Sequence, residues 1–254
     1  MLEVQELTKK FGHRIAVDRV TFQVKRGEIV GYLGPNGAGK STTAKMLVGM
    51  LKPSKGQILL NGGPIENNLA DYKMRVGYVP EEAVLYTHIS GREYLQLAGR
   101  LRGMQEDELS RKIDDLLKVC LLQPYKHSPI LSYSKGMKQK IMMLAAILHN
   151  PEILILDEPF SGLDVSSALV FRTLLKSFAV AGKAILFSSH VLEVIEKICK
   201  RVLIIHESRL VADDSVDKLR DLMHAPSLEE VFQQLVHHYD CDTAANDLFS
   251  IIHK

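Results

Sequence analysis

A short glycine-rich segment near the N-terminus limits the fold of this chain more than any other feature. Residues 34–42 read Gly-Pro-Asn-Gly-Ala-Gly-Lys-Ser-Thr, which fits the pattern Gly-x-x-x-x-Gly-Lys-Ser. In this pattern the glycines let several backbone N–H groups converge on one anion, the lysine supplies a positive charge, and the serine offers a hydroxyl to Mg²⁺. The segment therefore predicts a phosphate-binding loop made by Gly34, Asn36, Gly37, Ala38, Gly39, Lys40, Ser41 and Thr42.

The residues on either side of this loop have the pattern that such a site requires. Residues 28–33 are mostly apolar and predict a short buried strand, and residues 41–51 predict a helix that stops near Pro53. A strand, a loop and a helix in this order place a helix N-terminus, the positive end of its dipole, against the phosphates. The alternative is a glycine-rich turn in a structural loop, which does not require these neighbours.

Two acidic residues directly follow a second apolar run. Residues 153–156 read Ile-Leu-Ile-Leu, and Asp157 and Glu158 come next. Since ligands of a parallel sheet gather at the carboxyl ends of its strands, we expect Asp157 to hold Mg²⁺. Glu158 is expected to polarise a water for attack on the γ-phosphate. Alone, the two acids would fit solvated loop residues, and the phosphate-binding loop favours the functional interpretation.

His190 has a similar place in the sequence. It follows the apolar run at residues 184–187, which predicts another strand. A single histidine is usually a surface or core residue. Its position after a strand of the same sheet leads us to expect that it reaches the γ-phosphate.

Strand and helix patterns alternate along most of the 254 residues. Further strands are expected near residues 2–4, 22–24, 57–60, 76–79 and 202–205. Helical spacing dominates residues 87–150 and returns after residue 213. The pattern predicts an α/β fold with a mainly parallel sheet, into which a helical lobe is inserted.

Composition narrows the classes of partner and compartment. The formal net charge is only +2, which gives no electrostatic reason to expect nucleic acid as a partner. Cys120, Cys199 and Cys241 are far apart and odd in number, as expected of free thiols in a reducing compartment. No secretion signal is recognisable, and no apolar run approaches the ~20 residues of a membrane span. If the protein acts at a membrane, we therefore expect another chain to supply the membrane spans.

Taken together, the motifs and their order resemble the ATP-binding subunit of the ABC transporter superfamily over nearly the whole chain. The order is the loop at 34–42, Asp157-Glu158-Pro159, Ser161-Gly162-Leu163-Asp164 and His190. The resemblance implies that ATP and Mg²⁺ bind, and that Asp164 belongs to the nucleotide site. It also implies a P-loop NTPase core with an N-terminal antiparallel β subdomain and an inserted α-helical subdomain. The implied divisions are an ATP-binding core at 1–86 and 151–212, a helical lobe at 87–150 and a C-terminal helical tail at 213–254.

The chain departs from the family pattern at two places. Residues 133–137 read Tyr-Ser-Lys-Gly-Met where the family has Leu-Ser-Gly-Gly-Gln, so Ser134 and Gly136 are kept. By resemblance, Ser134 contacts the γ-phosphate of ATP held by a second copy of the chain, although a helix N-cap would explain it as well. Glu81 stands where the family has a glutamine that touches Mg²⁺. Its oxygens still suit a hard cation, and it adds negative charge near the phosphates.

Phe11 occupies the place of the aromatic residue that stacks on adenine in this family, with a core phenylalanine as the alternative. The segments at 80–82, 133–137 and 227–232 are similar to the bacterial branch tied to export of drugs, antibiotics, lipids or polysaccharides. Residues 237–242 contain metal-ligand residue types without a recognisable spacing, and a disordered tail is expected there.

The resemblance implies an ATPase that forms an ATP-dependent homodimer and drives a separate transmembrane permease subunit. It would be cytoplasmic and peripheral on the inner face of the cell membrane. One rival is a soluble ABC-type ATPase acting on ribosomes or DNA, which a single phosphate-binding loop and the lack of sustained heptads disfavour. Another is a regulatory subunit with weak hydrolysis, which Glu81 and the altered residues 133–137 leave open.

Overall fold

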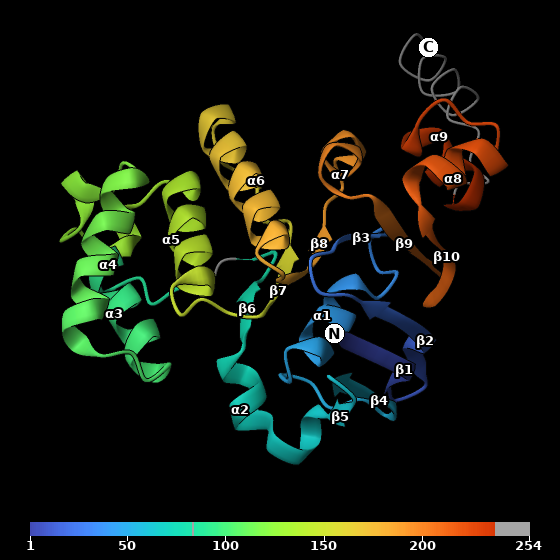
Figure 1. Cartoon of the computed structure of the whole chain (residues 1–254), viewed down its shortest axis with the longest axis horizontal. Helices are drawn as coiled ribbons and strands as arrows, with labels where there is room; N and C mark the ends of the chain where they lie inside the picture. The colour runs from blue at the N-terminus through green and yellow to red at the C-terminus, as the bar shows by residue number, and fades with distance from the viewer. Residues whose placement is uncertain (83, 237–254) are drawn as a thin grey trace, which may run out of the picture.

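Two β-sheets organise the chain in the computed structural model, which describes residues 1–82 and 84–236. The smaller sheet has the strand order β2-β1-β4-β5, and the larger has the order β10-β9-β3-β8-β7-β6 (Figure 1). The strands are β1 (Leu2–Phe11), β2 (Arg14–Val24), β3 (Ile29–Leu33), β4 (Lys55–Leu60), β5 (Gly63–Pro64), β6 (Val76–Val79), β7 (Ile153–Asp157), β8 (Ala184–Ser188), β9 (Arg201–His206) and β10 (Arg209–Ser215).

The larger sheet is parallel from β6 to β9, and only β10 pairs antiparallel, with β9. Its central strands β3, β7 and β8 are buried along their whole length. On β7, Ile153 and Ile155 join one apolar cluster, whereas Leu154 and Leu156 join the other. Successive side chains of a strand point to opposite faces, so this continuous apolar run covers both faces of the sheet. The predicted mainly parallel α/β fold is confirmed.

The smaller sheet is antiparallel throughout and lies beside the larger one (Figure 1). The runs predicted near residues 2–4 and 22–24 are parts of the longer strands β1 and β2. Gly12 and His13 join these strands, and Phe11 and Arg14 are direct cross-strand partners. The sheet thereby forms the N-terminal antiparallel unit that the resemblance implied.

The described residues also form α-helices, three of which lie together beside the larger sheet (Figure 1). They are α1 (Lys40–Leu47), α2 (Leu69–Met74), α3 (Gly91–Leu101), α4 (Glu106–Val119), α5 (Lys135–Ile147), α6 (Val165–Val180), α7 (Leu192–Ile198), α8 (Val216–Leu222) and α9 (Leu228–Val236). Short 3₁₀ turns lie at Ile65–Asn68, Gln123–Tyr125 and Ile130–Ser132. Helices α3, α4 and α5 come between β6 and β7 and project to one side of the sheet (Figure 1).

Local sequence explains two of these helices. A capping box starts α3, because Ser90 Oγ accepts from the Glu93 backbone N–H while the Glu93 carboxylate accepts from the Ser90 backbone. On α4, Leu109, Ile113 and Leu117 are fully buried, as their four-residue spacing predicts.

Two boundaries differ from expectation. Helix α1 ends at Leu47 rather than near residue 51, since Gly49 adopts a positive φ of 67° and the chain turns away. Residues 209–215 form β10, so helix begins only at Val216 and not at residue 213. The edge strand β10 has both charged and apolar residues, and its pairing with β9 defines it as a strand. Residues 237–242, which include Cys241, lie outside the described residues. Within 1–82 and 84–236, no helix is long and apolar enough to cross a membrane.

Candidate functional site

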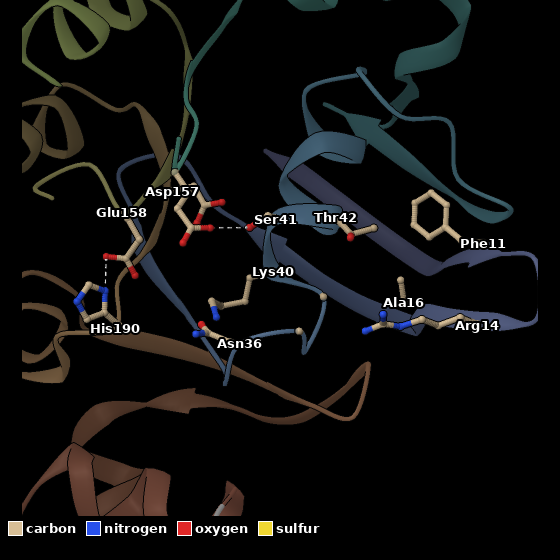
Figure 2. Close-up of a pocket in the computed structure, with 13 residues that line it drawn as sticks. Phe11, Arg14, Ala16, Asn36, Lys40, Ser41, Thr42, Asp157, Glu158 and His190 are labelled. Atoms are coloured by element: carbon tan, nitrogen blue, oxygen red, sulfur yellow. Dashed lines mark hydrogen bonds and ion pairs between the residues drawn. The ribbon is translucent and has the colours of Figure 1, made fainter. Parts of the chain in front are cut away.

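The strand order brings three distant parts of the sequence to one edge of the larger sheet. Strand β3 lies next to β8, and β8 lies next to β7, all parallel. Asp157, at the end of β7, is in register with Ser188 at the end of β8. The loop after β3 therefore meets Asp157 and the segment that contains His190. A cavity of about 830 Å³ opens at this point (Figure 2).

The loop after β3 has the conformation that the glycines predict. Gly39 has a φ of 113°, and a Cβ added there would lie 2.4 Å from the Ala16 carbonyl oxygen. A Cβ at Gly34 would lie 2.4 Å from the Ile205 carbonyl oxygen. Both positions therefore require glycine. Gly39 also caps α1 without a side chain, which leaves N–H groups of the first turn available to an anion.

Most of the loop residues named from the sequence face the cavity. Those that line it are Asn36, Gly37, Gly39, Lys40, Ser41 and Thr42. The Lys40 ammonium donates to the carbonyl oxygens of Gly34 at 2.6 Å and Pro35 at 3.1 Å. Ala38 is buried behind the loop, so it and Gly34 shape the loop without lining the cavity.

Asp157 lines the cavity, and one of its carboxylate oxygens has no hydrogen-bond partner among the described residues. Its side chain is 3% exposed, and the Ser188 hydroxyl donates to its Oδ1. Its Oδ2 is buried and has no hydrogen-bond partner within the described residues. A buried carboxylate oxygen without a donor costs free energy unless a cation or water meets it. With the Ser41 hydroxyl and the Glu81 carboxylate also lining the cavity, this oxygen-rich donor set fits Mg²⁺.

Glu158 and His190 form a pair at the same edge. The His190 Nδ1 and Glu158 Oε2 atoms are 2.9 Å apart, and the Ser189 hydroxyl is 3.4 Å from the same oxygen (Figure 2). Glu158 is 8% exposed, whereas 76% of the His190 side chain is exposed. Burial raises the pKa of Glu158, and the hydrogen bond with His190 opposes that rise. A carboxylate with a raised pKa beside a phosphate site is suited to accept a proton from water.

Glu81 follows β6, the neighbour of β7, and its side chain reaches the phosphate-binding loop. Its Oε2 accepts a hydrogen bond from the Ser41 hydroxyl at 3.4 Å. Burial lowers the pKa of the Lys40 ammonium, while the charges of Asp157, Glu158 and Glu81 raise it. The phosphate end of the cavity therefore combines one lysine with three carboxylates.

Phe11 lies at the far end of the same cavity. It is 51% exposed, so the interpretation as a core phenylalanine is wrong. Its neighbours Arg14 and Ala16 also line the cavity, and a Cβ added at Gly37 would lie 3.9 Å from the Arg14 guanidinium. Sequence reasoning missed these two residues. The two-residue connection Gly12-His13 was an available signal, because it makes Arg14 the cross-strand partner of Phe11.

Besides Gly34 and Ala38, three more of the predicted site residues do not line the cavity of this copy of the chain. Ser134 caps α5, its Oγ accepting from the Met137 N–H at 3.2 Å, and Asp164 caps α6 by accepting from the Ser167 N–H at 2.8 Å. Gly136 lies next to the segment before α6, since a Cβ on it would lie 2.7 Å from the Gly162 carbonyl oxygen. The helix-cap interpretation of Ser134 thus describes its contacts within one chain.

The fold and motifs match known proteins. Residues 17–161, more than half of the chain, match the family model described as ABC transporter. The chain is 40% identical over 210 residues to an uncharacterized ABC transporter ATP-binding protein of Methanocaldococcus jannaschii, covering 83% of this chain and 76% of that protein. It is 32% identical over 232 residues to Nod factor export ATP-binding protein I of Cupriavidus metallidurans, covering 91% and 77%.

A solved structure described as the ATP-binding subunit of an ABC transporter has the same fold. Its TM-score is 0.87 at 35% sequence identity, and the match covers 92% of this chain and 99% of that one. The chain belongs to the ABC transporter family, within which it is an ATP-binding subunit.

Proposed function

We propose that ATP is hydrolysed in the 830 Å³ cavity with Glu158 as the general base. The observation that carries this proposal is the contact of 2.9 Å between Glu158 and His190 beside the phosphate-binding loop. A water oxygen forms a bond to the γ-phosphorus and its proton passes to the Glu158 carboxylate. The bond between the γ-phosphorus and the β,γ-bridging oxygen breaks, and ADP leaves. His190 orients Glu158 and stabilises the γ-phosphate, and Lys40 offsets the charge of the phosphates.

We propose that Ser41, Asp157 and Glu81 hold Mg²⁺, which when bound neutralises charge on the β- and γ-phosphate oxygens. The unpartnered Asp157 Oδ2 supports this assignment. At the other end of the cavity, Phe11 would stack on adenine. A phenylalanine ring gives stacking area without a hydrogen-bonding group, so it selects poorly among bases.

We propose that a second copy of the chain completes the site. Ser134, Gly136 and Asp164 would face the nucleotide held by that copy, as the family resemblance implies. The close approach of Gly136 to Gly162 supports this, since the start of α5 lies beside the segment that leads to Asp164. The proposed divisions are a core at 1–86 and 151–212, a helical lobe at 87–150, and a C-terminal part at 213–254 whose first residues still belong to β10.

We propose that a separate transmembrane permease binds next to Glu81, which places this subunit at the cytoplasmic face of the membrane. Support comes from an apolar groove of about 290 Å³ lined by Tyr78, Pro80, Tyr86 and Leu101, of which Tyr86 and Leu101 are exposed. Pro80 directly precedes Glu81, so the groove adjoins the ATP cavity. The printed name of the Cupriavidus metallidurans relative, an export ATP-binding protein, favours export as the direction.

An ATPase assay on the purified chain, with and without membranes from its host, tests this function. We expect MgATP hydrolysis by the chain alone, a dimer that forms with ATP, and a changed rate when a co-purifying membrane protein is present. The absence of hydrolysis under both conditions, with ATP still bound, would favour the regulatory subunit instead. Copurification with ribosomes or DNA, and with no membrane protein, would contradict the transport assignment.

A further inference from the structure

Glu81 gives the phosphate end of the cavity a negative charge that the family's glutamine would not supply. Its carboxylate accepts from the Ser41 hydroxyl at 3.4 Å, and Ser41 is the second residue of α1. It therefore lies at the helix start where the phosphates are expected. The side chain is solvent-exposed, so its charge can be offset by ions as well as by protein groups.

The surroundings of Glu81 are already rich in carboxylates. Asp157, Glu158 and Glu81 all act on the Lys40 ammonium, whose hydrogen bonds are directed to two loop carbonyls. A nucleoside triphosphate without a metal brings several more negative charges into the same space. Lys40, Arg14 and the start of α1 must then offset both the ligand and the three carboxylates. The charge of Glu81 opposes binding of the metal-free nucleotide.

A divalent cation reverses the sign of this effect. Asp157, itself 3% exposed, presents a buried Oδ2 that has no partner among the described residues. That oxygen, the Ser41 hydroxyl and the Glu81 carboxylate provide oxygen atoms from three different segments of the chain. Hard divalent cations bind such oxygen atoms, and a carboxylate attracts them more strongly than a neutral amide does. With the cation present, Glu81 contributes to binding.

We propose that Glu81 makes nucleotide binding conditional on a divalent cation, by repelling the metal-free triphosphate and favouring the metal-bound form. This inference rests on the proposed ATP site and deepens it. Coupling between two ligands is reciprocal, so the nucleotide must raise the affinity for the cation by the same factor. A single exposed carboxylate, discounted for solvent screening, is expected to change this coupling by about tenfold.

Isothermal titration of the full chain with the ATP analogue AMP-PNP, in EDTA and in MgCl₂, measures the coupling as the ratio of the two dissociation constants. We expect Glu81→Gln to bind AMP-PNP more tightly than the native chain in EDTA, and the ratio to fall about tenfold. Glu82→Gln removes the same charge from the next residue, which is exposed and does not line the cavity. It is expected to keep the native ratio.

A second measurement follows the cation itself. Electron paramagnetic resonance of Mn²⁺ is expected to show weaker Mn²⁺ binding to the AMP-PNP complex of Glu81→Gln than to the native or Glu82→Gln complex. Equal ratios and equal Mn²⁺ affinities in all three proteins would overturn the role of Glu81, as would a larger ratio in Glu81→Gln.

Lys40→Ala separates this failure from failure of the proposed site. If AMP-PNP with Mg²⁺ binds the native chain and Lys40→Ala equally, the nucleotide site itself is wrong. If Lys40→Ala loses binding while Glu81→Gln keeps the native coupling, only the role of Glu81 is wrong. Circular dichroism of each variant checks that it folds.

Discussion

Replacing Glu158 by glutamine is expected to stop ATP turnover and to leave ATP binding nearly unchanged. The carboxylate is 8% exposed, and its Oε2 lies 2.9 Å from His190 Nδ1. Glutamine has nearly the same size and can keep a hydrogen bond to the imidazole, but it cannot take a proton from water. The change therefore removes proton acceptance and little else.

The size of the effect follows from general-base catalysis. Such a base contributes roughly 10²–10⁴-fold to the rate, which corresponds to about 2.7–5.4 kcal/mol in the activation free energy. Burial raises the pKa of Glu158, which makes its carboxylate a stronger base near neutral pH. We therefore expect a loss of about 10³-fold or more, in the upper part of that range.

Single-turnover phosphate release measures this loss, and binding of a fluorescent ATP analogue checks the affinity. The native rate should rise with pH as Glu158 loses its proton, and the variant should lack this rise. Glu82→Gln, an exposed change outside the cavity, should keep the native rate and profile. A Glu158→Gln rate within about threefold of native would refute the assignment of the base.

The same substitution has a second, independent consequence for stability. The pKa of Glu158 is raised in the folded chain, so the folded state favours the protonated form. Above that pKa the ionised carboxylate lowers the free energy of unfolding, and this destabilisation disappears as the pH falls through the folded pKa. Glutamine resembles the protonated form, so we expect a higher melting temperature than native at pH 8. A lower one would contradict this electrostatic picture.

Three further predictions concern the loop, the helical lobe and its junction with the core. Lys40→Ala should weaken ATP binding at least tenfold in a fluorescence titration because the cavity loses its lysine, whereas Lys45→Ala, exposed on α1, should not. Gly136→Ala would bring a Cβ within 2.7 Å of the Gly162 carbonyl oxygen and should lower the melting temperature by about 2–4 °C. An unchanged melting temperature would show that the two segments can move apart without loss of stability. Burial lowers the pKa of His149 to about 4 in the folded chain, whereas the pKa in the unfolded chain is near 6.5. Between pH 6.5 and pH 4 the imidazole is therefore protonated mainly in the unfolded chain. Native stability should therefore fall by about 1–2 kcal/mol more than that of His149→Gln over this range, and parallel urea midpoints would contradict it.

Much of this fold could be predicted because the residues of each central strand are enough by themselves to identify it as a buried strand. Strands β3, β7 and β8 are continuous apolar runs, and each ends at a residue group with its own chemistry. Parallel strands place such ends at one edge, which is why Lys40, Asp157 and His190 could be grouped from the sequence.

The parts that were missed depend on pairing between distant residues. Strand β10 has the mixed charge of a surface segment, and only its pairing with β9 makes it a strand. Arg14 belongs to no motif, and it reaches the cavity only because the β1–β2 hairpin places it opposite Phe11. Within one copy of the chain, Ser134 caps a helix. Its proposed contact with ATP requires a second copy.

A crystal structure of Glu158→Gln with ATP and Mg²⁺ tests the proposed site most directly. The proposed site predicts the triphosphate against the loop at 36–42, adenine on Phe11, and Ser134 of the partner subunit at the γ-phosphate. A nucleotide bound outside the 830 Å³ cavity, or a γ-phosphate that no second copy contacts, would contradict it.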